Sequence, residues 1–325
     1  MLSSPPPDGT VCVDAARYER VVDFTCLFAW SRAFFHRLLD CVVPNYELFE
    51  YAVAVNTSLT LLLIPKQLTK FVDLLLPNAA AFVHTLPGTA DNNRTCVLVS
   101  NDTLVTYETS TLGTPEEQRD RAARFRDRAL RAAGGSATAT TRPYVVFIER
   151  RKTREMQNTG RVKELVAARL PTMPLVSYHG NESMKDTIRL FAHARVVIGF
   201  HGAGFVNALF CRSGTVVLEF SLFMDETHTK LWRTNNKVAK LHGSLNWITY
   251  PLQLNAAAIP DWGNLHTRAN GPVADLFQNL PLVRVPETDA RKALDMVKGA
   301  LDDNAMRGGR AGGPFRGWDL PSVRL

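Results

Sequence analysis

The most informative segment of the sequence is VVIGFHGAGFVNALF (Val196–Phe210). The apolar run that ends at Phe200 predicts a buried strand, and Phe205–Cys211 predicts the start of a helix directly behind it. Gly202 and Gly204 lie between the two, where glycine lets the backbone approach a ligand closely. Because a helix N-terminus offers unpaired N–H groups and the positive end of its dipole, this turn predicts a site for a phosphate or diphosphate.

The segments around this turn alternate between strand and helix patterns. The predicted strands are Tyr144–Ile148, Pro174–Tyr178, Val196–Phe200 and Thr215–Phe220, and the predicted helices are Val162–Leu170, Ser183–Ala194 and, near the C-terminus, Glu287–Met306. Such alternation is typical of a parallel sheet covered by helices. We therefore expect an α/β fold whose parallel sheet is best defined in the C-terminal half.

The N-terminal half is separated from this region by a stretch of small residues, Ala132–Pro143, which is typical of a linker. The elements expected before it are helices within Tyr18–Tyr51 and over Leu68–Leu76, strands at Leu59–Pro65, Cys96–Ser100 and Leu104–Tyr107, and an arginine-rich helix at Arg119–Arg131. We predict an N-terminal domain over residues 11–134, a C-terminal ligand-binding domain over 142–306 and a disordered tail over 307–325.

The 325 residues carry 38 Lys+Arg and 31 Asp+Glu, a formal net charge of +7. With 46% hydrophobic and 21% charged residues, the composition excludes a disordered or fibrous chain. The run Arg119–Arg131 includes Asp120 and Asp127 at helical ion-pair spacing, and it has no aromatic side chain besides Phe125 on which bases could stack. We therefore expect no nucleic-acid partner, and the basic excess fits a small anionic ligand.

A second cationic segment, Arg150–Arg154, follows the predicted strand Tyr144–Ile148. The carboxyl ends of parallel strands are where α/β sheets bind ligands, and guanidinium groups suit the oxygens of a diphosphate. The alternative interpretation is a solvated basic turn. Glu219, at the end of a neighbouring predicted strand, is placed to bind a ribose hydroxyl.

The glycine pattern differs from the dinucleotide fingerprint G-x-G-x-x-G. That fingerprint requires a third glycine where Asn207 stands, and it does not explain His201 before the first glycine. The turn therefore favours a nucleotide ligand in general over NAD. A Rossmann-type NAD-dependent oxidoreductase is the alternative that the residues alone leave open.

At these residues the chain resembles glycosyltransferase family 61. The family's G-x-HGAG-L-x-N/H-x-LF turn is similar to Gly199–Phe210, and the strand V-x-E-L/F that follows it is similar to Val217–Phe220. Its R-x-x-x-R-x-x-x-N region is similar to the frame of Arg150, Arg154 and Asn158. The resemblance therefore includes both the glycine turn and the arginine segment, each of which already indicates a ligand site by its own residues.

The resemblance implies a GT-B architecture, with two Rossmann-like domains facing a cleft. It also implies inverting transfer of a sugar (xylose, arabinose or N-acetylglucosamine) from a UDP-sugar donor to a glycan or protein acceptor. The implied donor-binding residues are Arg150, Arg154, Asn158, His201, Gly202, Ala203, Gly204, Asn207 and Glu219. The alternative within the family is a non-catalytic module that binds a UDP-sugar.

The expected catalytic base lies upstream. Ala33–Phe49 is similar to the family's N-x-x-H-x-x-x-D-x-x-P segment, with His36 and Asp40 in phase. The two lie one helical turn apart, so the carboxylate can orient the histidine and raise its basicity. We predict His36 as the base and Asp40 as its partner; a structural ion pair is the alternative. Asp102 and Glu47 are less supported candidates.

Neither a DxD sequence nor a cluster with metal-ligand spacing occurs in the chain, so we predict catalysis without a metal and with no cofactor besides the donor. Four N-x-[ST] triplets favour the lumen of the Golgi or endoplasmic reticulum, at Asn56, Asn93, Asn101 and Asn181. The N-terminus lacks the pattern of a signal or an anchor, so we expect any membrane anchor in a longer precursor.

Overall fold

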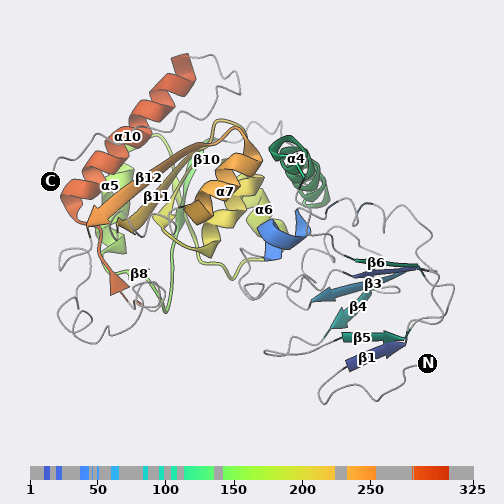
Figure 1. The fold of residues 1–325 in the computed structure, drawn as a ribbon. Coiled ribbons are helices and arrows are strands. Elements are labelled where there is room, and N and C mark those ends of the chain that lie inside the picture. The colour runs from blue at the N-terminus through green and yellow to red at the C-terminus, as the bar shows by residue number, and fades with distance from the viewer. Residues whose placement is uncertain are drawn as a thin grey trace. The chain divides into compact units, whose positions relative to one another are not determined.

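The computed structural model describes residues 113–134, 142–223, 233–253, 280 and 282–306. It also describes the shorter segments 11–14, 20–23, 37–43, 46, 50, 60–65, 83–86, 95–98 and 104–107. The chain divides into two units, Met1–Ala132 and Ala133–Leu325 (Figure 1). Most of the predicted linker lies outside the described residues, and so does the whole of the predicted tail over 307–325.

The second unit is built on a five-stranded parallel sheet with the order β12-β11-β10-β7-β9. Its strands are β7 (Tyr144–Ile148), β9 (Leu175–Tyr178), β10 (Ala194–Phe200), β11 (Val216–Phe223) and β12 (Asn246–Gln253). The predicted α/β class and parallel sheet are therefore confirmed. The sequence predicts four of these strands and misses β12.

Helices cover both faces of this sheet (Figure 1). On one face, α5 (Thr159–Arg169) and α10 (Glu287–Met306) pack against each other, and α10 packs on β11 and β12. On the other, α6 (Met184–His193), the short helix η5 (Ala203–Phe210) and α7 (Arg233–His242) pack together. A two-stranded parallel ladder, β8 (Glu155–Met156) with β13 (Leu282–Val283), completes the unit.

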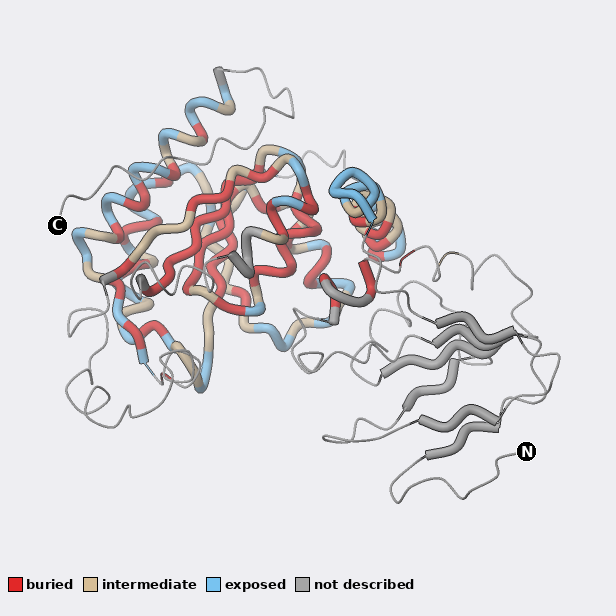
Figure 2. Tube along the Cα trace, viewed as in Figure 1, coloured by how far each residue is buried: buried red, intermediate tan, exposed pale blue. Residues whose placement is uncertain are grey.

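Burial on both faces explains why the central strands read as near-continuous apolar runs. Val145, Val146 and Phe147 in β7 are all fully buried, although consecutive side chains of a strand point to opposite faces. The same holds for Val197 and Ile198 in β10. Figure 2 shows this burial as continuous red tubes through the middle of the second unit.

The order of the strands reverses between β7 and β10, which are neighbours in register at Ile148 and Gly199. From β7 the chain crosses through α5 to β9 at one edge of the sheet, and from β10 it continues to β11 on the other side. The carboxyl ends of β7 and β10 therefore form the topological switch point, the place at which open α/β sheets bind their ligands.

The first unit contains a four-stranded parallel sheet with the order β4-β3-β2-β6 and a parallel pair, β1 with β5. The strands are β1 (Val11–Asp14), β2 (Arg20–Asp23), β3 (Thr60–Pro65), β4 (Val83–Leu86), β5 (Thr95–Leu98) and β6 (Leu104–Tyr107). A single-turn π-helix, η1, spans Arg37–Val42. The predicted strands at the positions of β3, β5 and β6 are confirmed.

The prediction of helices within Tyr18–Tyr51 does not hold at the start of this range. β2 is a strand, paired with both β3 and β6. Its two adjacent β-branched residues, Val21 and Val22, suit a pleated strand better than a helix, and the helical spacing of aromatic residues begins only after them. The predicted helix at Leu68–Leu76 lies outside the described residues.

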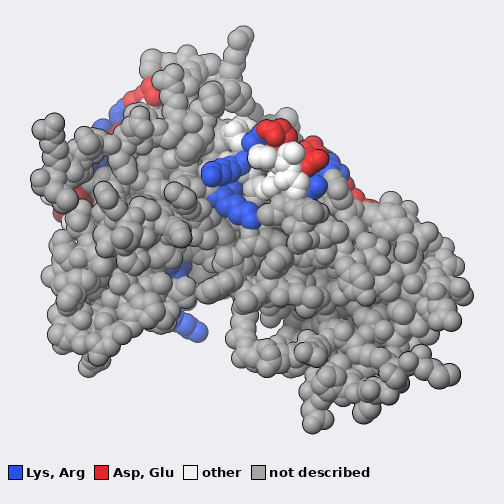
Figure 3. Space-filling view, in the orientation of Figure 1, with Lys and Arg blue, Asp and Glu red and all other residues white. Residues whose placement is uncertain are grey.

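The arginine-rich helix is α4 (Pro115–Ala132). Thr114 and Glu117 cap its start reciprocally, since each backbone N–H donates to the other residue's side chain. Arg124 pairs with Asp120 at 3.0 Å, and the buried Phe125 packs edge-on against Tyr46. The predicted mixed-sign pairs are confirmed, and Figure 3 shows acidic and basic side chains side by side over α4.

Candidate active site

Arg150 and His201 occupy the switch point because Arg150 lies two residues beyond the end of β7 and His201 directly follows β10. The Arg150 Nε donates to the carbonyl of Thr153 at 3.0 Å, and its Nη2 donates to the Thr153 hydroxyl at 3.2 Å. Its Nη1 donates to the carbonyl of His201 at 3.3 Å. All three acceptors are neutral, and no carboxylate among the described residues pairs with Arg150. Burial lowers the pKa of this guanidinium, which still carries its charge at neutral pH.

The glycines of the turn are required by close packing. A Cβ on Gly202 would lie 1.5 Å from the Arg150 Nη1, and a Cβ on Gly204 would lie 2.9 Å from the Ile148 Cγ2. The φ of Gly202 is 168°, an extended value that any residue adopts, so its constraint is the neighbouring guanidinium and not the backbone. Between the two glycines, Ala203 is exposed. The turn and Arg150 therefore fit together at one surface.

A buried carboxylate fixes the histidine of the turn. Glu219 is 1% exposed; one of its oxygens hydrogen-bonds the His201 Nδ1, and the other accepts from the Trp247 Nε1 at 3.0 Å. Trp247 also packs on Phe205, with ring centroids 5.6 Å apart. Glu219 lies inside β11 and not at its end as predicted, because Ser221–Phe223 continue to pair with β12. Its place indicates that it orients His201.

The helix predicted at Phe205–Cys211 is a 3₁₀-helix over Ala203–Phe210. Asn207 is buried, and its Nδ2 donates to the carbonyl of Gly204 at 3.1 Å and to the Tyr178 hydroxyl at 3.0 Å. An asparagine side chain that bonds the backbone three residues earlier favours the tighter turn. Asn207 therefore ties the turn to β9.

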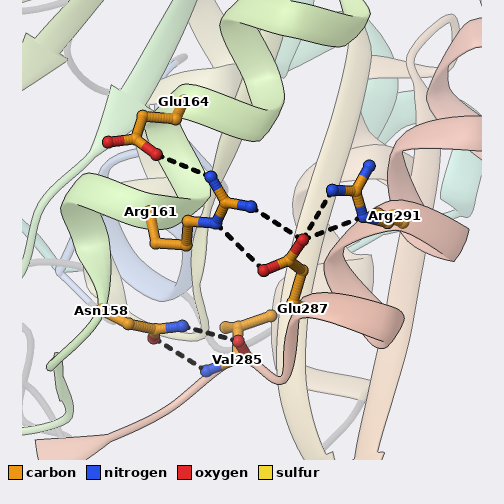
Figure 4. Close-up of polar contacts among 6 residues, drawn as sticks. All are labelled: Asn158, Arg161, Glu164, Val285, Glu287 and Arg291. Carbon is orange, nitrogen blue, oxygen red and sulfur yellow. Dashed lines mark hydrogen bonds and ion pairs between the residues drawn. The ribbon is translucent and has the colours of Figure 1, made fainter.

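Arg154 and Asn158, the other members of the arginine frame, lie on the loop that follows β7. Arg154 is half-buried; burial and the nearby charge of Arg150 lower its pKa to about 10. Asn158 bonds both backbone groups of Val285: its Nδ2 donates to the carbonyl, and its Oδ1 accepts from the N–H (Figure 4). Arg154 is thus close to Arg150, whereas the amide of Asn158 is occupied by the C-terminal segment.

A polar cluster at the ends of β7 and β9 was not expected from the sequence. Glu149 forms an ion pair with Lys163 of α5 and lies 3.6 Å from the His179 Nδ1. Burial raises the pKa of Glu149, but hydrogen bonds with Lys163 and Ser177 outweigh this effect and hold the pKa below its usual range. Lys163 lies within α5, whereas Glu149 directly follows β7, so no local sequence motif predicts the pair.

The structure describes neither side chain of the predicted catalytic pair. His36 lies outside the described residues, and Asp40 lies in η1, where the structure describes the backbone but not this side chain. Their pairing remains a prediction.

The described residues contain no group of three or more His, Cys, Asp or Glu side chains arranged to hold a metal ion. Of the helices that the structure describes, none has the length and apolar character needed to cross a bilayer.

A charged arginine and a two-glycine turn lie at the switch point of a parallel sheet, the place at which open α/β domains bind their ligands. The family described as Glycosyltransferase 61 matches residues 34–218, which include β7, the arginine frame and the whole glycine turn. The match covers more than half of the chain, so this protein belongs to glycosyltransferase family 61 and is a glycosyltransferase. It therefore takes a sugar donor and a glycan acceptor. A comparison with curated proteins finds no match.

Proposed function

We propose that this protein is an inverting glycosyltransferase that moves xylose, arabinose or N-acetylglucosamine from a UDP-sugar to a glycan or protein acceptor. The observation that carries the proposal is the environment of Arg150. Its guanidinium is half-buried at the switch point, is held only by neutral acceptors among the described residues, and lies against the Gly202 turn. Such a guanidinium forms its strongest hydrogen bonds with a charged acceptor, and a diphosphate supplies one.

In the proposed reaction, the acceptor hydroxyl oxygen attacks the anomeric carbon of the sugar from the side opposite UDP. A new carbon–oxygen bond forms as the bond to the diphosphate oxygen breaks, and the electron pair of that bond leaves with UDP. The hydroxyl proton passes to the base, for which His36 oriented by Asp40 is our candidate. Arg150 and Arg154 stabilise the charge that develops on the leaving diphosphate.

The turn contributes to the same step. Ala203 and Gly204 begin η5, and the first N–H groups of a helix have no acceptor within it, so they suit phosphate oxygens. We also assign His201, which Glu219 orients, to the donor site. Guanidinium and N–H groups together supply the positive charge that a metal supplies elsewhere, so we propose that catalysis needs no metal. Activity should then survive EDTA.

The proposal extends to the whole chain. Both units contain parallel sheets, which supports a GT-B architecture with an acceptor domain over 11–134 and a nucleotide-sugar domain over 142–306. We also propose the lumen of the Golgi or endoplasmic reticulum. The support is the sequon at Asn181, which is exposed in the loop between β9 and α6; the other three sequons lie outside the described residues.

The test is a donor screen that measures UDP release and, separately, UDP binding by calorimetry. Arg150→Ala should weaken UDP binding by about ten- to a hundredfold, the usual worth of hydrogen bonds to a charged group. Arg142→Ala, which removes an exposed arginine just before β7, is the matched control and should change nothing. Absence of UDP binding in the unmodified protein would contradict the proposal, and binding without turnover would identify a non-catalytic family member.

A further inference from the structure

We propose that Asn158 and Glu287 are positioning residues of the donor site, which act by holding the loop that carries Arg154. The inference rests on the proposed function, because it assigns that loop to the binding of UDP. We call residues 150–158 the arginine loop. We call Leu280 and Leu282–Glu287, which run alongside it, the C-terminal strap. The arginine loop is strained, the strap holds it, and two side chains hold the strap.

The arginine loop adopts a conformation that it would not keep alone. Lys152 has a φ of 74° and Arg154 a φ of 52°, both in the left-handed region that non-glycine residues rarely occupy. The loop also brings two half-buried guanidinium groups together, and burial with the charge of Arg150 lowers the pKa of Arg154 to about 10. Backbone strain and like-charge repulsion persist only where the surroundings enforce them, and such places cluster at ligand sites.

The C-terminal strap supplies that enforcement through the backbone. The Arg154 N–H donates to the carbonyl of Leu280 at 2.5 Å, so the strap bonds the strained residue itself. The next two residues form β8, which pairs in parallel with β13 of the strap. The Gln157 N–H then donates to the carbonyl of Val283 at 2.8 Å. The second half of the arginine loop is therefore paired along its length.

Two side chains hold the strap in this position (Figure 4). The Asn158 Nδ2 donates to the Val285 carbonyl at 2.7 Å, and the Val285 N–H donates to the Asn158 Oδ1 at 3.1 Å. Two residues further on, the carboxylate of Glu287 accepts from the Arg161 Nε and Nη2 at 3.0 and 2.9 Å, and from Arg291. Glu287, the last residue of the strap, thereby joins the first turns of α5 and α10.

The placement of these groups distinguishes positioning from ligand contact. The strap lies beyond residues 34–218, the part of the chain that matches the family. The amide of Asn158, which the family frame groups with the donor-binding arginines, already bonds Val285 through both of its atoms. Its influence on the donor should therefore pass through Arg154. Glu287, whose carboxylate accepts hydrogen bonds from Arg161 of α5 and Arg291 of α10, should have an influence of the same kind.

The experiment compares Glu287→Gln and Asn158→Ala with the control Asp295→Asn. The control removes the Arg169–Asp295 ion pair of 2.7 Å, which also joins α5 to α10 but lies two helical turns further along α10. The first readout is amide hydrogen exchange at Arg154 and Gln157 in the unliganded protein. We expect exchange to accelerate about fivefold in Glu287→Gln, the upper range for an exposed ion pair, and about tenfold in Asn158→Ala, which loses two hydrogen bonds.

The second readout is the binding of UDP and the steady-state kinetics with the donor. We expect the Kd for UDP and the KM for the donor to rise by about the same factors as the exchange rates, with kcat within about twofold of the unmodified protein. Asn158→Asp, which keeps the acceptor for the Val285 N–H but loses the donor, should fall between Asn158→Ala and the unmodified protein. Asp295→Asn should change neither readout.

The outcomes separate the two proposals. If the unmodified protein does not bind UDP, the proposed function fails, while the exchange rates still report whether the strap holds the arginine loop. If the unmodified protein binds UDP and Glu287→Gln behaves like Asp295→Asn in both readouts, the positioning role is wrong. If Asn158→Ala weakens UDP binding without accelerating exchange, Asn158 contacts the donor directly and the inference is overturned.

Discussion

Replacing Gly202 by alanine tests the fit between the glycine turn and Arg150. The added Cβ would lie 1.5 Å from the Arg150 Nη1 and 2.7 Å from its Cζ, so the guanidinium must leave its place. It would lose its bond to the His201 carbonyl, and its charge would no longer lie against the turn. The backbone itself tolerates the change, because the φ of 168° is open to any residue.

The expected size of both effects, on stability and on UDP binding, depends on which atoms the added methyl group displaces. The clashing atoms are the far end of a flexible side chain, so we expect the free energy of unfolding to change by less than about 1 kcal/mol. UDP binding should weaken by about ten- to a hundredfold, because hydrogen bonds from a charged group are worth about 1.5–3 kcal/mol. Gly204→Ala is the contrast: its Cβ would press on Ile148 of the buried strand β7 at 2.9 Å, so it should cost about 1–3 kcal/mol of stability.

The assay combines urea unfolding with calorimetric UDP binding in a double-mutant cycle. Once Arg150→Ala has removed the guanidinium, Gly202→Ala has nothing to displace and should have little further effect on binding. Two results would refute the reasoning. One is unchanged UDP affinity in Gly202→Ala. The other is a full additional loss when Gly202→Ala is added to Arg150→Ala, since that would place the effect of the methyl group elsewhere.

Three further predictions concern strain, a buried carboxylate and pH. Lys152→Gly should be more stable than Lys152→Ala by about 1 kcal/mol in urea unfolding, because only glycine relieves the φ of 74°; equal stabilities would contradict this. Trp247→Phe keeps a ring against Phe205 but removes a donor to the buried Glu219, so it should destabilise the protein by about 1–3 kcal/mol, and an unchanged midpoint would be contrary evidence. Hydrogen bonds, first from Arg161, lower the pKa of Glu287 to about 2. Its contribution to stability is therefore complete above its unfolded pKa of about 4.3 and is lost as the pH falls towards 2. Acid unfolding of Glu287→Gln should lack this component, and identical acid curves would argue against it.

Elements with one dominant pattern could be predicted from the sequence with their observed bounds. β7 was predicted because it is buried on both faces and therefore apolar throughout, and α10 because its apolar residues recur at helical spacing. β12 was missed because its sequence, NWITYPLQ, includes Pro251. A proline is tolerated there because β12 is the edge strand of the sheet, and only the strand order reveals that position.

The positions of some residues of the candidate site could also be predicted from the sequence, whereas their hydrogen-bond partners could not. Arg150 and His201 could be placed together because each follows a predicted strand, and parallel strands bring their carboxyl ends to one edge. The partners of the site residues could not be predicted. Asn158 bonds Val285, which lies 127 positions away, and Glu219 bonds a tryptophan on the edge strand. Such contacts depend on how elements pack, and no local spacing encodes them.

The buried Glu219 has a consequence for how the sheet assembles. It joins a residue that follows β10, its own strand β11 and Trp247 of β12. Because side chains alternate between the faces of a strand, a slip of one residue in β11 would turn the carboxylate into the apolar layer under α10 and leave a charge buried without partners. The acid therefore disfavours a one-residue slip during folding, and a chain that has formed both hydrogen bonds of Glu219 has also paired these strands correctly.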